Sequence, residues 1–309
     1  MRTVPVARRP NKVSAAEFAH APGNKGDRSF AAFVDALPDV LVARDFRAVV
    51  DAIAKAATAR RGVIVMLGGH VVKTGLAPIL VDLMARGVIT HIAMNGSAAI
   101  HDYEVARFGA TSEDVAAGLR DGTFGMAEET GREMNTAFIE GMRAGYGMGE
   151  TLGRALDART DLANPELSVL LGAWRRGVTA TVHAAVGAEI IHQHPVANGA
   201  AIGDTSHRDF RRLAASIADL DDGGVVLNVG SAVIMPEVFL KALTIARNLS
   251  DGKPQNFVTV DLDMQRHYRP RVNVVQRPTL QSGKGYEITG HHEIMVPLLA
   301  WAVVERLAG

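Results

Sequence analysis

GVIVMLGGHVV (residues 62–72) and GVVLNVGSAVI (residues 224–234) are two versions of one pattern, a run of Val, Ile and Leu that ends at small residues. Each run lacks polar alternation, which predicts a parallel strand buried on both faces. Glycine at the end of such a strand lets a ligand approach the backbone, and the helix that follows offers unpaired N–H donors. Because ligands bind at the carboxyl ends of the strands in an open sheet, the pattern predicts a binding site there.

Strand and helix signals alternate along most of the remaining chain. We expect strands at residues 62–67, 88–94, 177–184, 224–229 and 256–262. We expect helices at residues 46–59, 75–86, 98–108, 207–220, 236–249 and 293–307. This alternation predicts a doubly wound α/β fold with a mostly parallel, Rossmann-like sheet.

The chain length of 309 residues suits one large α/β domain or two smaller ones, and we expect a single domain over residues 1–309. Residues 1–45 read as a lead-in with short helical pieces. Residues 110–172 are rich in Gly, Met and Ala, and their apolar spacing is helical. We interpret them as a helical insertion that covers the site or forms a subunit contact.

Charge and residue usage exclude several classes of partner and site. Lys plus Arg and Asp plus Glu both number 33, so no global charge recruits nucleic acid or an anionic membrane. The absence of cysteine excludes disulfides, thiolate nucleophiles and Cys-ligated zinc, and makes a reducing cytoplasm the simplest setting. No apolar run approaches the roughly 20 residues that span a bilayer. We therefore expect a cytoplasmic protein with no nucleic-acid or membrane partner.

The loop after the first strand, GGHVVKTG, concentrates groups that suit ligand binding. Gly68 and Gly69 leave the backbone open, and Thr74 supplies a hydroxyl. His70 supplies a base and Lys73 a cation, whose position near a helix start favours an anionic ligand. No glycine precedes Lys73, so the loop lacks the G-K-[ST] element of a P-loop. The alternative is a solvated lysine and a histidine hydrogen-bonded within a turn.

Asn95, Gly96 and Ser97 form a second polar turn at the end of the next predicted strand. His101 follows one helical turn later and is a candidate polar group of the pocket. The turn lies where the strand should deliver ligand contacts. Asn95 or Ser97 could also be a plain N-cap, and capping does not exclude contact with a ligand.

Histidines gather between the third strand and its helix. The group comprises His183, His192, His194 and His207, with Glu189 and Asp204 nearby. His192 and His194 could face one side of a strand, so a metal site is one interpretation. The spacing matches no metalloenzyme signature, and we favour histidines that act in acid–base chemistry or hydrogen bonding in a pocket.

Near the C-terminus, QSGKGYE at residues 281–287 is dense in polar groups. Glycines flank Lys284, so its amine is sterically open and, if desolvated, could attack an imine or a carbonyl. A flexible surface turn is the alternative. Lys284 and Lys73 are thus the candidate reactive or anion-binding amines, and Glu237 is a further candidate polar group of the pocket.

Together these loops resemble the deoxyhypusine synthase family over roughly residues 60–300. The resemblance rests on the order of Lys73–Thr74–Gly75, Asn95–Gly96–Ser97, the acidic Asp102 and Glu104, the glycine-rich turn at residues 229–234 and the strand at residues 258–262. Members of that family have a Rossmann-like sheet and bind NAD near the subunit interfaces of a homotetramer. They transfer an aminobutyl group from spermidine by oxidation and imine formation on a lysine.

The resemblance also implies which residues face the cofactor. NAD would contact residues 68–74, residues 95–97, Gly230 and Ser231, and Asp261 or Asp263 would approach the adenosine ribose. The glycine turn here continues as Met-Pro-Glu, where the family has a lysine and paired histidines. The resemblance therefore implies the fold and the nucleotide site more strongly than the spermidine chemistry.

We expect an NAD-binding, transferase-like enzyme that acts on a small amine or carbonyl substrate and assembles as a homo-oligomer, a dimer or a tetramer. The first alternative is a non-catalytic member that keeps a nucleotide or sugar-phosphate pocket. A weaker alternative is a metal-dependent hydrolase that uses His192, His194 and a carboxylate.

Overall fold

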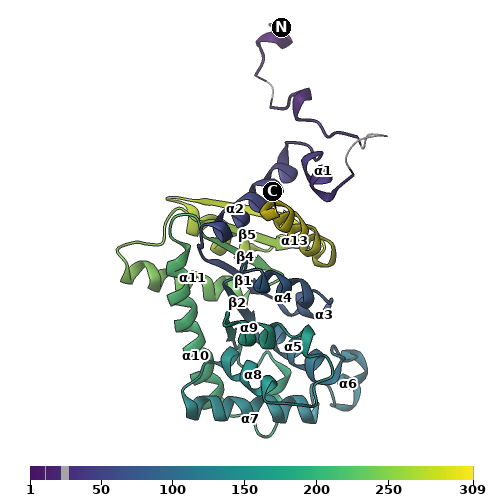
Figure 1. The fold of residues 1–309 in the computed structure, drawn as a ribbon, viewed down its shortest axis with the longest axis vertical. Helices are drawn as coiled ribbons and strands as arrows, with labels where there is room; N and C mark the ends of the chain where they lie inside the picture. The colour runs from purple at the N-terminus through teal and green to yellow at the C-terminus, as the bar shows by residue number, and fades with distance from the viewer. Residues whose placement is uncertain (11, 22–27, 309) are drawn as a thin grey trace.

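Six parallel strands form the centre of the computed structural model, which describes residues 1–10, 12–21 and 28–308. Their order across the sheet is β3-β2-β1-β4-β5-β6, and Figure 1 labels the four central strands β2, β1, β4 and β5 in that order. The strands are β1 (Val63–Leu67), β2 (His91–Asn95), β3 (Thr179–His183), β4 (Val225–Val229), β5 (Val258–Asp263) and β6 (Lys284–Thr289). The strand order reverses between β1 and β4, so this pair marks the switch point at which open α/β sheets bind ligands. The predicted doubly wound, Rossmann-like fold is thus confirmed.

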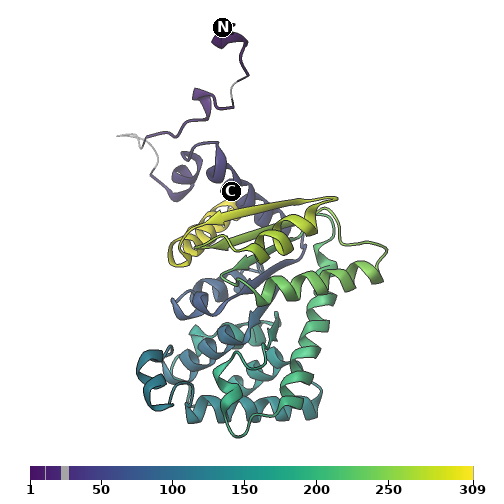
Figure 2. The same ribbon diagram turned by 180° about the vertical axis from the view of Figure 1, so that it is seen from behind.

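Helices cover both faces of the sheet (Figure 1 and Figure 2). The first face carries α2 (Leu41–Thr58), α4 (Ala77–Ala85), α5 (Gly96–Phe108), α9 (Val169–Arg176) and α13 (His292–Ala308). The second carries α10 (Gly199–Ser216), α11 (Ile234–Leu249) and the π-helical turn η6 (Arg271–Gln276). In β1, Val63, Val65 and Leu67 pack toward the first face, and Ile64 and Met66 pack toward the second. All five are buried, which is why the strand reads as an uninterrupted apolar run.

Two stretches differ from the sequence-based expectation. The polar stretch at residues 281–287, for which a flexible surface turn was one of the two interpretations, enters the strand β6. β6 lies at the edge of the sheet, and only Tyr286 and Ile288 in it are buried, so its apolar pattern is too short to be recognised. The expected loop after β1 instead contains the short helix α3 (Gly69–Lys73), because Val71 and Val72 pack into the core.

The segment predicted as a helical insertion is helical in the structure. It contains α6 (Val115–Asp121), α7 (Glu128–Ala144), α8 (Met148–Asp157), η3 (Pro165–Leu167) and the start of α9. In Figure 1, α6, α7 and α8 lie together at one end of the molecule, and α8 packs against β3. Asp102 fixes the start of α9, because its carboxylate accepts hydrogen bonds from Ser168 Oγ (2.7 Å) and Val169 N (2.6 Å). The side chain of Asp102 therefore has a structural role.

The N-terminal segment extends away from the sheet, and the C-terminal helix packs on it (Figure 1). This helix, α13, lies beside α2. Residues 11 and 22–27 of the lead-in lie outside the described residues. Every helix in the described part of the chain is too short or too polar to cross a bilayer. The remaining short elements are η1 (Val6–Arg8), η2 (Ala15–Glu17), α1 (Phe30–Asp35), η4 (Ile190–Gln193), η5 (Ile217–Leu220), α12 (Tyr268–Pro270) and η7 (Arg277–Thr279).

Candidate functional site

The backbone turns after β1 and β4 touch at the switch point. Gly68 N–H donates to Val229 O (3.0 Å), and Gly230 N–H donates to Leu262 O (3.1 Å). A Cβ on Gly68 would lie 1.9 Å from Gly230 O, so only glycine fits at the first turn. Gly230 has a φ of +68°, a left-handed conformation that also favours glycine. The glycines that the sequence pointed to thus lie together at the ends of adjacent strands.

An imidazole pair lies beside this turn. The rings of His70 and His292 have centroids 5.6 Å apart, and His292 Nε2 lies 3.9 Å from Asp263 Oδ1. His292 is 1% exposed, and neither of its ring nitrogens has a hydrogen-bond partner among the described residues. Burial lowers the pKa of His292, while Asp263 and the backbone of Leu262 act in the opposite direction, and the ring borders the crevice. From the sequence, His292 belongs only to a stretch dense in polar groups, residues 289–293, and has no assigned role, because a histidine at the start of a terminal helix carries no motif.

Other residues predicted at the crevice have framework contacts. Ser231 Oγ accepts from Met235 N (3.2 Å) near the start of α11. Asp261 Oδ1 accepts from Asn228 Nδ2 (2.8 Å), and burial raises the pKa of Asp261 to about 7. Asp263 is 7% exposed and accepts from Met264 N (2.7 Å). Contact between these three residues and a ligand therefore stays a prediction.

A cavity of about 750 Å³ lies next to the crevice, between α5 and the insertion. Lys73, Ser97 and His101, which the sequence singled out from two separate loops, all line its wall. Glu104 and Glu189 add carboxylates to the same wall. A large cavity with a few convergent polar groups is the usual form of a small-molecule site.

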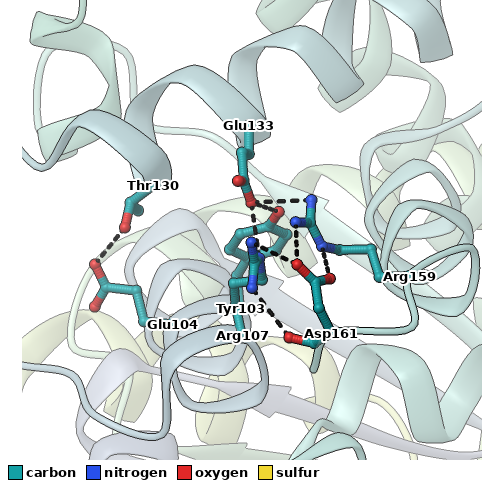
Figure 3. A network of polar contacts seen from close by, with 7 residues as sticks. All are labelled: Tyr103, Glu104, Arg107, Thr130, Glu133, Arg159 and Asp161. Atoms are coloured by element: carbon teal, nitrogen blue, oxygen red, sulfur yellow. Dashed lines mark hydrogen bonds and ion pairs between the residues drawn. The ribbon is translucent and has the colours of Figure 1, made fainter. Parts of the chain in front are cut away.

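Hydrogen bonds join His101 to the insertion. His101 Nδ1 lies 2.7 Å from Thr111 Oγ1, and the Thr111 hydroxyl donates to Glu104 Oε2. The other oxygen of Glu104 accepts from Thr130 Oγ1 at 3.0 Å (Figure 3). Burial lowers the pKa of His101, and the charges of Lys73 and His70 lower it further. At neutral pH His101 is therefore a neutral imidazole.

A second network holds the wall of the cavity in place (Figure 3). Glu133 on α7 accepts from Tyr103 Oη (2.8 Å) and Arg107 Nε (3.2 Å) on α5. Arg159 Nη1 lies 3.3 Å from the same carboxylate, and Arg107 Nη2 lies 3.1 Å from Asp161 Oδ2. Arg107 and Glu133 expose only 15% and 12% of their side chains, so this network ties α7 firmly to α5.

Glu189 is a site residue that the sequence showed only as a neighbour of the histidine group. Its carboxylate accepts from Ala185 N (2.7 Å) and lies 3.3 Å from His192 Nε2. Burial raises the pKa of Glu189 to about 7, which suits a group that exchanges a proton near neutral pH. A Cβ on Gly96 would lie 2.0 Å from Glu189 Cδ, so glycine at the start of α5 makes room for the carboxylate.

Two further predicted residues have local contacts near the site. Asn95 Oδ1 accepts from Ala98 N (2.9 Å) and caps α5. The Thr74 hydroxyl donates to His70 O (2.8 Å). The first contact is the capping alternative stated above, the second is a local bond at the end of α3, and neither excludes a ligand.

Two predicted catalytic residues lie outside the cavity. Lys284 begins β6, so it lies at the amino-terminal edge of the parallel sheet, opposite the crevice, with Nζ 4.8 Å from the Tyr286 ring centroid. The structure does not bring Lys284 to the other candidates. Glu237 lies in the first turn of α11, hydrogen-bonded to Asn273 Nδ2 (2.9 Å) and paired with Lys241, whose hydrogen bond lowers the pKa of Glu237.

The histidine group does not converge on one point. His183 Nε2 bonds Thr181 Oγ1 (3.0 Å), His194 Nε2 lies 3.2 Å from Glu128 Oε2, and His207 stacks on Phe210. Within residues 1–10, 12–21 and 28–308, no set of three or more His, Asp and Glu side chains is arranged to hold a metal ion. The hydrolase alternative therefore has no support from this geometry.

Solved structures of other proteins share this fold. A protein of Entamoeba histolytica assigned as a deoxyhypusine synthase is 10% identical, with a TM-score of 0.53, over 90% of this chain and 93% of its own. AgrE, in a ternary complex with ornithine and NAD+, is 13% identical, with a TM-score of 0.54, over 92% of this chain and 34% of its own. ArgZ, a cyanobacterial arginine dihydrolase, is 14% identical, with a TM-score of 0.52, over 86% of this chain and 33% of its own.

This chain therefore spans about a third of the length of AgrE and of ArgZ. At these identities the likeness shows a shared fold alone. No family model matches the chain, and a search of curated proteins found no match.

Proposed function

We propose that this protein is an enzyme that binds NAD at the β1–β4 crevice and acts on a small amine or carbonyl compound in the adjoining cavity. The observation that carries the proposal is the contact between the glycine turns at Gly68 and Gly230, next to a cavity with acid–base groups. The presence of NAD+ in the AgrE complex, on a similar fold, supports the choice of cofactor. When bound, NAD supplies a hydride acceptor.

The crevice fits a dinucleotide in its backbone and its polar groups. The N-terminus of α5 follows directly after β2, and that of α11 follows β4 after four residues, so N–H groups at these helix starts suit a pyrophosphate. A Cβ on Gly69 would lie 2.3 Å from Ser97 Oγ, so glycine at this position lets the turn after β1 pack directly against α5. His292 and Asp263 offer polar atoms for ribose hydroxyls on the other side.

The cavity supplies groups for the substrate. Lys73 has no ion-pair or hydrogen-bond partner among the described residues, so its amine is available to a carbonyl or an anionic group. His101 is a neutral base, and Glu189 has a pKa near 7. These groups suit proton transfer to and from an amine or a carbonyl.

We expect NADH fluorescence to appear when the protein is given NAD+ and the right member of a panel of small amines and alcohols. His101→Gln should lower that rate by about 100-fold or more, the usual contribution of a general base. His207→Gln, on an exposed face of α10, is the matched control and should keep the rate. A fully active His101→Gln variant would contradict the assignment of the base.

A non-catalytic nucleotide-binding protein is the second candidate. The position of Lys284 at the far edge of the sheet favours it, because that lysine cannot then form an imine in the cavity. In that case NAD would stabilise the wild type and the Lys73→Ala variant equally, and no amine or alcohol would be turned over.

A further inference from the structure

Three side chains at the cavity wall form a directional row: His101, Thr111 and Glu104. The Thr111 hydroxyl carries one hydrogen, and it donates that hydrogen to Glu104. The hydroxyl oxygen can therefore only accept from His101 Nδ1, at 2.7 Å. It follows that Nδ1 carries the ring proton of neutral His101, and that Nε2 carries a lone pair.

The free nitrogen lies on the side of the ring that faces the site. A Cβ on Gly69 would lie 3.2 Å from His101 Cδ2, the ring atom bonded to Nε2 and remote from Nδ1. This edge of the ring thus faces the turn after β1, and His101 is also one of the residues that line the cavity. Nε2, which is bonded to Cδ2, therefore lies on the edge of the ring toward the proposed cofactor crevice.

The insertion supplies the middle residue of the row, Thr111, and a second hydroxyl, that of Thr130, which contacts Glu104. Thr111 lies on the loop between Gly109, whose φ is +77°, and α6. Thr130 on α7 holds the second oxygen of Glu104 at 3.0 Å. Glu104 and His101 both belong to α5, so the insertion fixes their relative orientation through two hydroxyls. The charged groups near the ring are Lys73 and Glu104, together with the imidazole of His70.

We propose that Thr111 is a positioning residue that holds His101 in the Nδ1–H tautomer, so that Nε2 receives the proton of the substrate. This step rests on the proposed function. The O–H or N–H bond of an alcohol or amine breaks and its proton goes to Nε2. NAD+ held at the crevice would supply the oxidant: it would take the hydride of the neighbouring C–H bond, so that a C=O or C=N bond forms.

Nuclear magnetic resonance of 15N-histidine-labelled protein tests the tautomer without any ligand, with His101→Gln to assign the signals. We expect wild-type His101 as the Nδ1–H tautomer. Thr111→Val should shift the tautomer ratio toward Nε2–H by about fivefold or more, the equivalent of one hydrogen bond. Thr111→Ser should restore the wild-type ratio. Thr136→Val, an identical change at an exposed position of α7, should leave it unchanged.

An Nε2–H tautomer in the wild type, or a ratio that Thr111→Val does not alter, would overturn the proposal. The same variants distinguish this failure from failure of the proposed function. If NAD-dependent turnover exists, Thr111→Val should lower kcat more than it raises KM, and Thr111→Ser should rescue kcat. An Nδ1–H tautomer in a protein that neither binds NAD nor turns over any panel compound would refute the function and leave the positioning of His101 intact.

Discussion

Gly68→Ala is expected to destabilise the protein by about 3 kcal/mol and to abolish NAD binding. The new Cβ would lie 1.9 Å from Gly230 O and 2.6 Å from Gly230 C, both backbone atoms that a side-chain rotation cannot move. The ends of β1 and β4 would have to separate, and overpacking of this kind costs about 1–3 kcal/mol or more. Urea unfolding measures the loss of stability, and an NAD titration below the unfolding range measures the loss of binding.

Gly203→Ala is the matched control for this change. Gly203 lies within α10, and a Cβ there would meet no atom within 4 Å. Alanine in a helix interior is favoured over glycine by roughly 0.5–1 kcal/mol, so the control should be slightly more stable than the wild type. Equal stability of the two variants would mean that the turns at Gly68 and Gly230 are not in contact.

Glu189→Gln is expected to change the pH dependence of stability. Burial raises the pKa of Glu189 from 4.5 to about 7, so between these values the folded state binds a proton that the unfolded state has lost. The contribution of Glu189 to stability is therefore full below pH 4.5 and is lost as the pH rises to about 7. The loss is about 1.4 kcal/mol for each pH unit, or about 3 kcal/mol in all.

The glutamine variant lacks this titration. As the pH rises from 4.5 to 7.5, its free energy of unfolding should therefore increase by about 3 kcal/mol relative to that of the wild type. Urea unfolding of both proteins across this range gives the difference directly, because the other buried carboxyls contribute equally to both. Asp221→Asn is a control of opposite sign, since hydrogen bonding to Lys253 lowers the pKa of Asp221. The difference in the free energy of unfolding between Asp221→Asn and the wild type should change only at a pH below the ordinary pKa range of carboxyl groups. A flat difference for Glu189→Gln would show that this carboxyl is not buried.

The sequence predicted those strands that are buried on both faces. β1 and β4 consist of Val, Ile, Leu and Met, apart from Asn228, and every residue in both strands is buried. Such runs carry a strong signal. β6 lies at the edge of the sheet, and only Tyr286 and Ile288 in it are buried, so the sequence did not reveal it as a strand. The direction of β6 also decides the position of Lys284, which a polar motif alone cannot show.

The candidate site was predictable where it follows strand ends. Lys73, Ser97 and His101 come together because parallel strands deliver their loops to one edge. Thr111 and Glu189 reach the same cavity from loops that lie 10 and 88 residues beyond His101, and no spacing rule links such positions. Their roles depend on tertiary packing, which hydrogen bonds and burial reveal and a motif does not.

Calorimetric titration of the wild-type protein with NAD+ tests the central claim most directly, with Gly230→Trp titrated alongside after its folding is checked by circular dichroism. A Trp side chain at Gly230 would project from the turn where a Cβ already lies 3.0 Å from the His292 ring, and it would fill the crevice. The account predicts saturable binding to the wild type and none to a folded Gly230→Trp variant. Absence of binding at millimolar NAD+, or equal binding by both proteins, would contradict a dinucleotide site between β1 and β4.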